Sequence, residues 1–286
     1  VHLRKTMPTK SRHAHPISTA KAKWTSHEGY EDIIYETSDD GIARITINRP
    51  EVRNAINGET SKAMSEALDA CEEDDEILAV VITGAGDKSF SAGMDLKAFA
   101  TGEGADVMGG KGGFAGIAQR DFPKPIIAAV NGTAQGGGFE IMISCDLVVA
   151  AEHATFGIPE VKRGIAAGAG GLIRIAKRIP LPIALEMAMT GDPIDTTRAL
   201  QLGLINRVVP ADKLIDEAVA LAEKICENGP LAVQVSKKLV RQAMEMPEEQ
   251  AWDLNMKGLA EVFTSEDARE GPLAFAQKRK PQWKGR

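Results

Sequence analysis

Histidine is scarce in the part of the chain where catalysis would need it. Five of the 286 residues are histidines, and four of these lie within residues 1–27. The rest of the chain keeps only His153, in a strand-like stretch. The sequence therefore gives little support to a Ser-His-Asp triad, a Cys-His pair or a multi-histidine metal site, and we expect no metal.

Cysteines and long apolar runs are also few. The three cysteines are far apart and form no CxxC pair. Their odd number and wide spacing indicate neither a disulfide framework nor a zinc site, and they favour a reducing, cytoplasmic location. No apolar run is long enough to span a bilayer, so we expect no membrane partner.

Acidic residues are absent from residues 1–27, which carry six lysines and arginines. The whole chain has a net charge of −6, so the remainder carries −12. An acidic body disfavours nucleic acid as a partner. Residues 1–28 also lack apolar periodicity, and we expect a disordered basic tail there. A transit peptide, a solvated extension and an upstream start before Met7 all stay open.

The body of the chain has the patterns of an α/β core followed by helices. Length and an apolar content of 43% predict one large domain, or one domain with an appended helical piece. Alternating residues predict a β-hairpin over 33–47, and helical spacing after Asn57 predicts a helix to about residue 74. Buried strands are expected at 77–83, 125–130 and 146–151, with a short buried helix at 138–145. Further helices are expected at 181–190, 195–202, 211–228, 230–245 and 247–263, with a strand at 204–209.

Two glutamates each close a glycine-containing turn that lies among apolar residues. Glu140 ends the segment Ala134–Glu140, and Glu160 ends Ala154–Glu160. A buried carboxylate costs free energy unless it has a partner or a task. The pair predicts two acid/base groups in a partly dry pocket, beside backbone that a ligand can approach closely. For either glutamate alone, a helix-terminal acid favoured by the macrodipole is the alternative.

Three segments together resemble the crotonase (enoyl-CoA hydratase/isomerase) superfamily. They are Ser89–Lys97 (SFSAGMDLK), Ile127–Glu140, and Phe156–Glu160 continuing to Gly171. Their order and spacing match over residues 30–286, and the closing stretch 265–286 is most similar to the carnitinyl-CoA dehydratase branch. The resemblance implies an α/β fold, a spiral of repeated β-β-α units over residues 29–230. A C-terminal helical region, 231–286, would serve oligomerisation and cover the site.

The resemblance also implies a reaction. The reaction is the reversible hydration of a 2-enoyl-CoA, or the dehydration of a 3-hydroxyacyl-CoA, through an enolate held in an oxyanion hole. The N–H groups of Met94 and Gly137 would form that hole. Glu140 would act on the water and Glu160 on the α-proton, or the two roles could be exchanged. The N–H of Gly168 would help to hold the water. No metal or redox cofactor is implied, because the acidity comes from the thioester and the oxyanion hole. Coenzyme A enters as part of the substrate.

Binding residues follow from the same resemblance. Coenzyme A would lie near Ala92, with Arg53 and Lys97 as candidate phosphate ligands. The candidate acyl-pocket residues are Met108, Phe139 and Ile158, with core packing as the favoured role of Phe139. The partner would be an acyl-CoA thioester, in a homotrimer or a dimer of trimers.

Departures from the family pattern leave the substrate open. Ile158 and Ala167 replace a polar residue and a proline that are common in fatty-acyl hydratases, which disfavours a plain fatty-acyl substrate. Residues 101–116 contain seven glycines and predict either a surface loop or a lid over the substrate. The alternatives are a double-bond isomerase of the same superfamily and, from another class, a non-catalytic RNA-binding or scaffold homologue.

Overall fold

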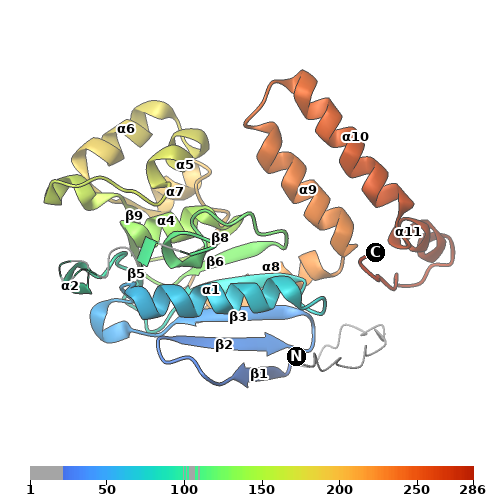
Figure 1. Cartoon of the computed structure of the whole chain (residues 1–286), viewed down its shortest axis with the longest axis horizontal. Coiled ribbons are helices and arrows are strands. Elements are labelled where there is room, and N and C mark those ends of the chain that lie inside the picture. Colours follow the sequence, from blue (N-terminus) through green and yellow to red (C-terminus); the bar gives the residue numbers. More distant parts are fainter. Residues whose placement is uncertain (1–21, 99, 101, 103–106, 109) are drawn as a thin grey trace, which may run out of the picture. The chain divides into compact units, whose positions relative to one another are not determined.

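The structure is a computed structural model, and it describes residues 22–98, 100, 102, 107, 108 and 110–286. Residues 1–21 of the expected tail, and part of the glycine-rich segment 101–116, lie outside the described residues. The chain divides into two compact units, Lys23–Glu227 and Asn228–Arg286. The expectation that residues up to 28 lack regular structure is wrong for Trp24–His27. These residues form strand β1 and pair antiparallel with β2 (Figure 1).

A seven-stranded mixed sheet is the framework of the first unit. Its order is β1-β2-β3-β4-β6-β8-β11, in which β1 to β3 run antiparallel and the other neighbours pair in parallel. The predicted hairpin and the three predicted buried strands are confirmed. The strands after β1 are β2 Ile33–Ser38, β3 Ile42–Ile47, β4 Ala79–Gly84, β6 Ile126–Val130, β8 Leu147–Ala151 and β11 Arg207–Val209.

The central strands are apolar throughout because helices cover both faces of the sheet. In β4, Val80 and Ile82 belong to the core cluster that contains residues of α1 (Gly58–Glu73). The intervening Val81 belongs to the opposite cluster, with residues of α8 (Leu214–Cys226). Since successive side chains of a strand point to opposite faces, a strand covered on both sides has no polar alternation.

Helix α1 begins and ends where its sequence provides partners for the main chain. The Asn57 side chain accepts a hydrogen bond of 2.8 Å from the N–H of Thr60, as a predicted N-cap should. At the other end the buried Lys124 ammonium donates to the carbonyls of Cys71 and Asp74, at 2.6 and 2.7 Å. Between these caps the helix buries the apolar face that the sequence predicted.

A second, smaller sheet positions the candidate site, and no pattern in the sequence indicates it. Its order is β10-β9-β7-β5, and β5, β7 and β9 run parallel. Parallel strands bring their carboxyl ends to one edge of a sheet. The segments that carry Met94, Gly137 and Glu160 follow these three ends directly. The strands are β5 Ser89–Ser91, β7 Thr133–Gln135, β9 Thr155–Gly157 and β10 Ile194–Asp195.

Short helices fill the connections of the first unit. They include η1 Pro50–Val52, α2 Leu96–Ala98, η3 Phe114–Gly116, α4 Gly137–Ser144, η4 Pro159–Arg163, α5 Gly171–Arg178, α6 Leu181–Thr190, α7 Thr196–Gln201 and η5 Ala211–Lys213. The helix predicted at 138–145 and those predicted at 181–190 and 195–202 are confirmed. Helix α5 was not predicted.

The second unit is helical, and its chain end folds back on its last helix. Its helices are α9 Pro230–Ala243, α10 Glu248–Thr264 and α11 Asp267–Ala276. The first two were predicted and the third was not. Asp267 at the start of α11 accepts hydrogen bonds from the N–H groups of Lys284 and Gly285, at 2.6 and 2.8 Å. Among the helices that the structure describes, none is long and apolar enough to cross a membrane.

Candidate active site

Just after strand β5, the main-chain N–H of Met94 faces away from the neighbouring segment at Ile56. Ile56 donates to the carbonyl of Gly93 and accepts from the N–H of Asp95, each at 2.8 Å. In such a parallel bridge the groups of the residue between, Met94, point to the other side. No acceptor among the described residues takes the Met94 N–H. The oxyanion donor expected at Met94 is therefore open.

The start of helix α4 lies against this strand end. The first intrahelical bond runs from the N–H of Glu140 to the carbonyl of Gly136, at 3.0 Å, so the N–H of Gly137 has no acceptor within the helix. A Cβ atom on Gly93 would lie 2.5 Å from the Gly137 nitrogen. Position 93 therefore has to be glycine for the two segments to meet with the Gly137 N–H uncovered. The structure thus brings both predicted oxyanion donors together.

Glu140 is the more tightly held of the two glutamates. It lies on α4 and is 3% exposed. Its Oε1 accepts hydrogen bonds from the N–H groups of Ala169 and Gly171, at 2.7 and 2.8 Å. Burial raises the pKa of Glu140, and the charge of Glu160 adds to the rise, whereas the two N–H donors and Arg174 oppose it. No described residue hydrogen-bonds Oε2, which leaves that oxygen for a ligand.

Glu160 sits in η4, and its carboxylate lies over the turn that precedes α4. A Cβ atom on Gly136 would lie 3.0 Å from Oε1 of Glu160, and Gly136 itself has a positive φ of 55°. Oε2 of Glu160 is buried and has no hydrogen-bond partner among the described residues. Burial raises the pKa of Glu160, and the charge of Arg163 opposes the rise. A buried oxygen without a partner is costly unless a proton or a ligand satisfies it.

The ring of Phe114 covers the start of α4. A Cβ atom on Gly137 would lie 2.5 Å from Cζ of Phe114, which is 1% exposed. The chain can turn the ring inward because residues 113, 115 and 116 all have positive φ. Sequence reasoning singled out the glycine-rich stretch but missed this aromatic residue within it.

The predicted acyl-pocket and water-binding residues divide into two groups. Met108 is half-buried and lies near Gly168, where an added Cβ would be 3.9 Å from the Met108 Cε. Gly168 itself is exposed, beside the turn that holds Glu140. Phe139 and Ile158 are 0% and 1% exposed and belong to the main hydrophobic core. Core packing, which we favoured for Phe139, therefore also describes Ile158.

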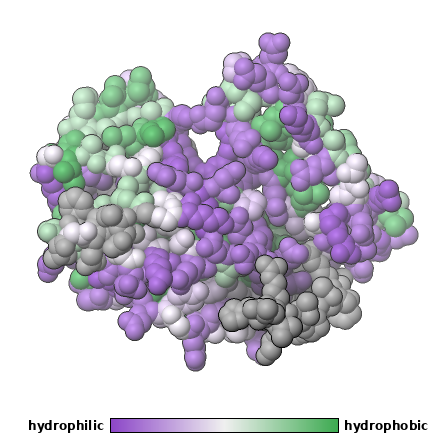
Figure 2. All heavy atoms as spheres, in the orientation of Figure 1, coloured by the Kyte–Doolittle hydropathy of each residue, from purple (hydrophilic) through white to green (hydrophobic). Residues whose placement is uncertain are grey.

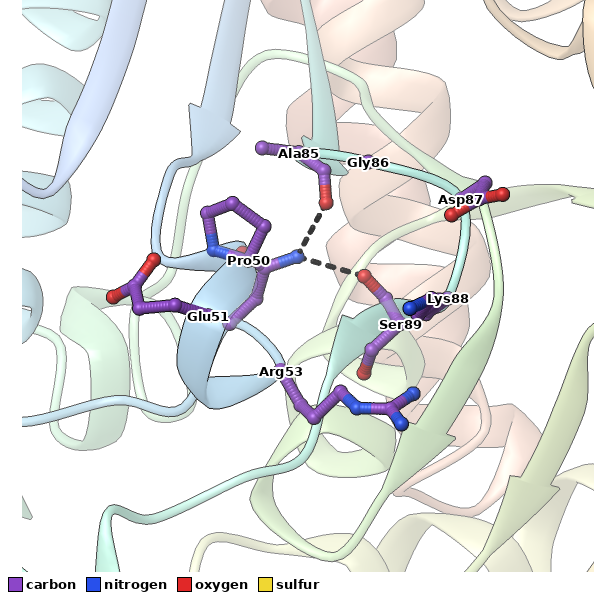
Figure 3. A pocket seen from close by; sticks show the side chains of 9 residues that line it. Pro50, Glu51, Arg53, Ala85, Gly86, Asp87, Lys88 and Ser89 are labelled. Carbon is purple, nitrogen blue, oxygen red and sulfur yellow. Dashed lines mark hydrogen bonds between the residues drawn. The ribbon is translucent and has the colours of Figure 1, made fainter.

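Of the residues predicted for coenzyme A, only Arg53 lines the described pocket. Arg53 is exposed and lines a pocket of about 330 Å³ (Figure 3). Its carbonyl accepts a hydrogen bond of 3.0 Å from the N–H of Ala92. Asn54 braces the wall by donating to the carbonyls of Ala85 and Ser89, at 3.0 and 2.7 Å. Lys97 is exposed on α2 and does not line this pocket. The lining residues are Pro50, Glu51, Arg53, Asn54, Ala85, Gly86, Asp87, Lys88 and Ser89.

The main-chain donors to Glu140 were missed by sequence reasoning. We expected the N–H of Gly168 to help to hold the water, and that role stays a prediction. The N–H groups of Ala169 and Gly171 hold the carboxylate of Glu140. The glycine-rich run 168–171 was visible in the sequence, yet only the fold shows which N–H groups point inward. Within the described ranges, no group of three or more His, Cys, Asp or Glu residues could hold a metal ion.

The fold and the pair of carboxylates, Glu140 buried and Glu160 half-buried, beside open N–H groups define an α/β protein of the crotonase type. A sequence model of the enoyl-CoA hydratase/isomerase family matches residues 37–286, and the chain belongs to this family. A carnitinyl-CoA dehydratase of Salmonella enteritidis PT4 is 45% identical over 258 residues, covering 88% of this chain and 98% of that protein.

Two solved structures are similar over nearly the whole chain. An enoyl-CoA hydratase from Mycobacterium tuberculosis H37Rv has a TM-score of 0.85 at 45% identity, covering 89% of this chain and 99% of the other. A carnitinyl-CoA hydratase from Mycobacterium avium has a TM-score of 0.69 at 48% identity, covering 90% of this chain and 100% of the other.

Proposed function

We propose that this protein is a hydro-lyase that adds water to a 2-enoyl-CoA thioester, and removes it from the 3-hydroxyacyl-CoA product in reverse. The partnerless buried oxygen of Glu160, set over the same helix start as Glu140, is the observation that carries the proposal. Two carboxylates whose pKa values are raised by burial are suited to exchange protons with a substrate. The names of the relatives, which describe hydratases and a dehydratase, point the same way.

Each group has a role that balances the reaction. The N–H groups of Met94 and Gly137 stabilise the thioester oxygen as negative charge develops on it. Glu140 takes one proton from water through Oε2, and the remaining hydroxyl group bonds to the β-carbon. Glu160 gives a proton to the α-carbon, so the sum is one water molecule added across the double bond. No metal or redox group is needed for these steps.

We propose that the acyl-CoA substrate lies in the first unit, between the pocket beside Arg53 and the two glutamates. Arg53, at the pocket in Figure 3, would contact the coenzyme A end together with Ala92, whose N–H donates to the Arg53 carbonyl, and Lys97. Met108 would line the acyl side together with the ring of Phe114. The candidate acyl groups are short 2-enoyl chains and the crotonobetainyl group. A cytoplasmic place in acyl-CoA metabolism, which suits a protein with three free thiols, completes the proposal.

We also propose a homotrimer or a dimer of trimers. Helix α6 exposes Leu181, Leu185 and Met189, which contribute to the hydrophobic surface over that helix in Figure 2. In the other unit, α10 exposes Trp252, Met256 and Phe263. Exposed apolar residues in such groups are typical of interfaces. Sedimentation velocity on the full chain tests the proposal, and a monomer at micromolar concentration would contradict it.

The test of the reaction uses paired substitutions and one matched control. Crotonyl-CoA and crotonobetainyl-CoA are mixed with the enzyme, and loss of the enoyl absorbance is followed. We expect E140Q and E160Q each to lower kcat by about 100- to 10,000-fold while thioester binding persists. The control is E59Q, at an exposed position on α1, which should retain wild-type turnover. Unchanged turnover in E140Q or E160Q would contradict the proposal. Migration of a double bond without net hydration would identify an isomerase instead.

A further inference from the structure

Arg174 spans two segments that meet beside Glu140. It lies in the first turn of α5, and its guanidinium folds back over the turn that precedes the helix. Nη1 donates to the carbonyl of Ala169 at 3.2 Å, and Nη2 donates to the carbonyl of Ala118. A Cβ atom on Gly170 would collide with Nη1, and Gly170 has a φ of 95°. Glycine at position 170 therefore makes room for the guanidinium.

The turn that Arg174 contacts is the one that holds Glu140. Ala169 donates its N–H to Oε1 of Glu140, and its carbonyl accepts from Arg174. The N–H of Gly171, on the other side of Gly170, donates to the same oxygen. A single residue, Ala169, thus links the carboxylate to the guanidinium through its two main-chain groups. Any rotation of this turn would move both donors away from Oε1.

The second contact of Arg174 reaches the segment that carries Phe114. Ala118 follows η3, and its own N–H donates to the carbonyl of Phe114 at 3.1 Å. Arg174 therefore joins the turn that orients Glu140 to the segment whose Phe114 ring covers the start of α4. Two parts of the proposed site, far apart in sequence, share this one side chain.

We infer that Arg174 is a positioning residue for Glu140. By fixing the turn 169–171 it commits Oε1 to the two N–H donors and presents Oε2 to the water. The inference rests on the proposed function, which supplies the water and the role of Oε2. The charged groups that act on Glu140 are Glu160 from η4, which raises its pKa, and Arg174 from α5, which lowers it. Loss of the guanidinium should therefore disturb both orientation and titration.

Helix α5 offers a matched control. Arg178 lies one turn after Arg174 and also donates to a main-chain carbonyl, that of Cys145 at 3.1 Å. This contact is made at the C-terminal end of α4, away from the carboxylate of Glu140. A substitution of Arg178 removes the same kind of hydrogen bond and the same charge from the same helix. It should leave the position and the titration of Glu140 unchanged.

The experiment compares R174M, R174K, R178M and wild-type enzyme. The full chain is used, and folding is checked by circular dichroism and Tm. Two quantities are measured: the pH dependence of kcat and KM, and the titration of the Glu140 carboxyl carbon by ¹³C NMR, assigned by its loss in E140Q. We expect R174M to lose on the order of 100-fold in kcat with little change in KM, because a displacement of about 1 Å at a reacting group has that effect. Its Glu140 pKa should rise, whereas R178M should match wild type in both quantities.

The R174K variant distinguishes the effect of the positive charge at position 174 from the effect of the two hydrogen bonds that Arg174 donates. R174K keeps the positive charge but cannot bridge two carbonyls with a planar fork. It should titrate Glu140 like wild type and still lose much of kcat. If R174M does not fold, R174K and R178M decide, and equal kcat in these two would overturn the inference.

Failure of the inference and failure of the proposed function give different results. If the wild-type enzyme turns over no enoyl thioester, the function proposed above is wrong, and the titration still decides the role of Arg174. A Glu140 pKa that is the same in R174M, R178M and wild type overturns the inference. So does an equal loss of kcat in R174M and R178M, because that result describes a general effect of weakening α5.

Discussion

Helices α4 and α5 start in the same way but face different surroundings. Each has a glycine with positive φ as its N-cap, Gly136 and Gly170, and each begins with a further glycine. A charged side chain lies over each turn, Glu160 over the first and Arg174 over the second. At the start of α5 the N–H of Gly171, like that of Ala169 just before the N-cap, is bound by Glu140, whereas the N–H of Gly137 at the start of α4 has no acceptor within its helix.

The difference shows that the role of a helix start depends on the group that faces its N–H donors. At α5 that group is the carboxylate of Glu140, so this helix start positions a proposed catalytic residue. At α4 the nearby groups are Gly93, the ring of Phe114 and the carboxylate of Glu160, none of which accepts the Gly137 N–H. The same backbone arrangement therefore holds a carboxylate at the start of α5. In the proposed reaction it stabilises the charge on the thioester oxygen at the start of α4.

The largest effect is expected from a substitution that obstructs the N–H of Gly137 at the start of α4. In G93A the new Cβ would lie 2.5 Å from the Gly137 nitrogen, so the two segments must separate. We expect kcat for hydration to fall by about 100- to 1000-fold, as for the loss of one oxyanion donor. Steady-state kinetics with crotonyl-CoA, together with binding of a saturated acyl-CoA, measures the change.

Backbone strain needs its own control, because alanine at a positive φ is unfavourable anywhere. Gly203 has a φ of 71°, and nothing lies within 4 Å of an added Cβ there. G203A should lose stability to a similar extent without the loss in kcat. If G93A and G203A turn over substrate equally fast, the N–H of Gly137 does not stabilise the transition state.

Sequence patterns predicted the strands of the large sheet other than β1 and singled out the two glutamates, but they did not predict the smaller sheet that positions the site. Runs such as 77–83 identify themselves because they are buried on both faces. Strands β5, β7 and β9 have three residues each, too few to show any period. Arg174 was missed because its partner Ala118 lies 56 residues away, and no local pattern marks such a contact. The roles of the site residues stay predictions.

The two glutamates should also control the pH dependence of hydration. Glu140 must be ionised to accept a proton from water, and burial raises its pKa. Activity should therefore fall as the pH drops through this raised pKa, by about tenfold per pH unit, with a midpoint above the ordinary glutamate value of about 4.3. The profile of kcat/KM against pH measures the midpoint in the free enzyme. A midpoint at or below the ordinary value would show that the two N–H donors at α5 outweigh burial.

The smallest expected effect is a difference in thermal stability between the variants E160Q and E140Q. Burial raises the pKa of Glu160 in the folded state above its value in the unfolded chain. As the pH rises past the unfolded value, ionisation of this carboxyl favours the unfolded chain, so the fold loses stability. E160Q does not ionise, and it should unfold at a higher temperature than wild type at pH 7.5, with the gain fading as the pH is lowered toward 4. E140Q should show less gain or a loss, because it also weakens two charge-assisted hydrogen bonds of about 1.5–3 kcal/mol each. Thermal unfolding of both variants at the two pH values measures the difference. Equal changes in Tm for the two would mean that the N–H donors of Ala169 and Gly171 give Glu140 no advantage over Glu160, whose Oε2 has no hydrogen-bond partner among the described residues.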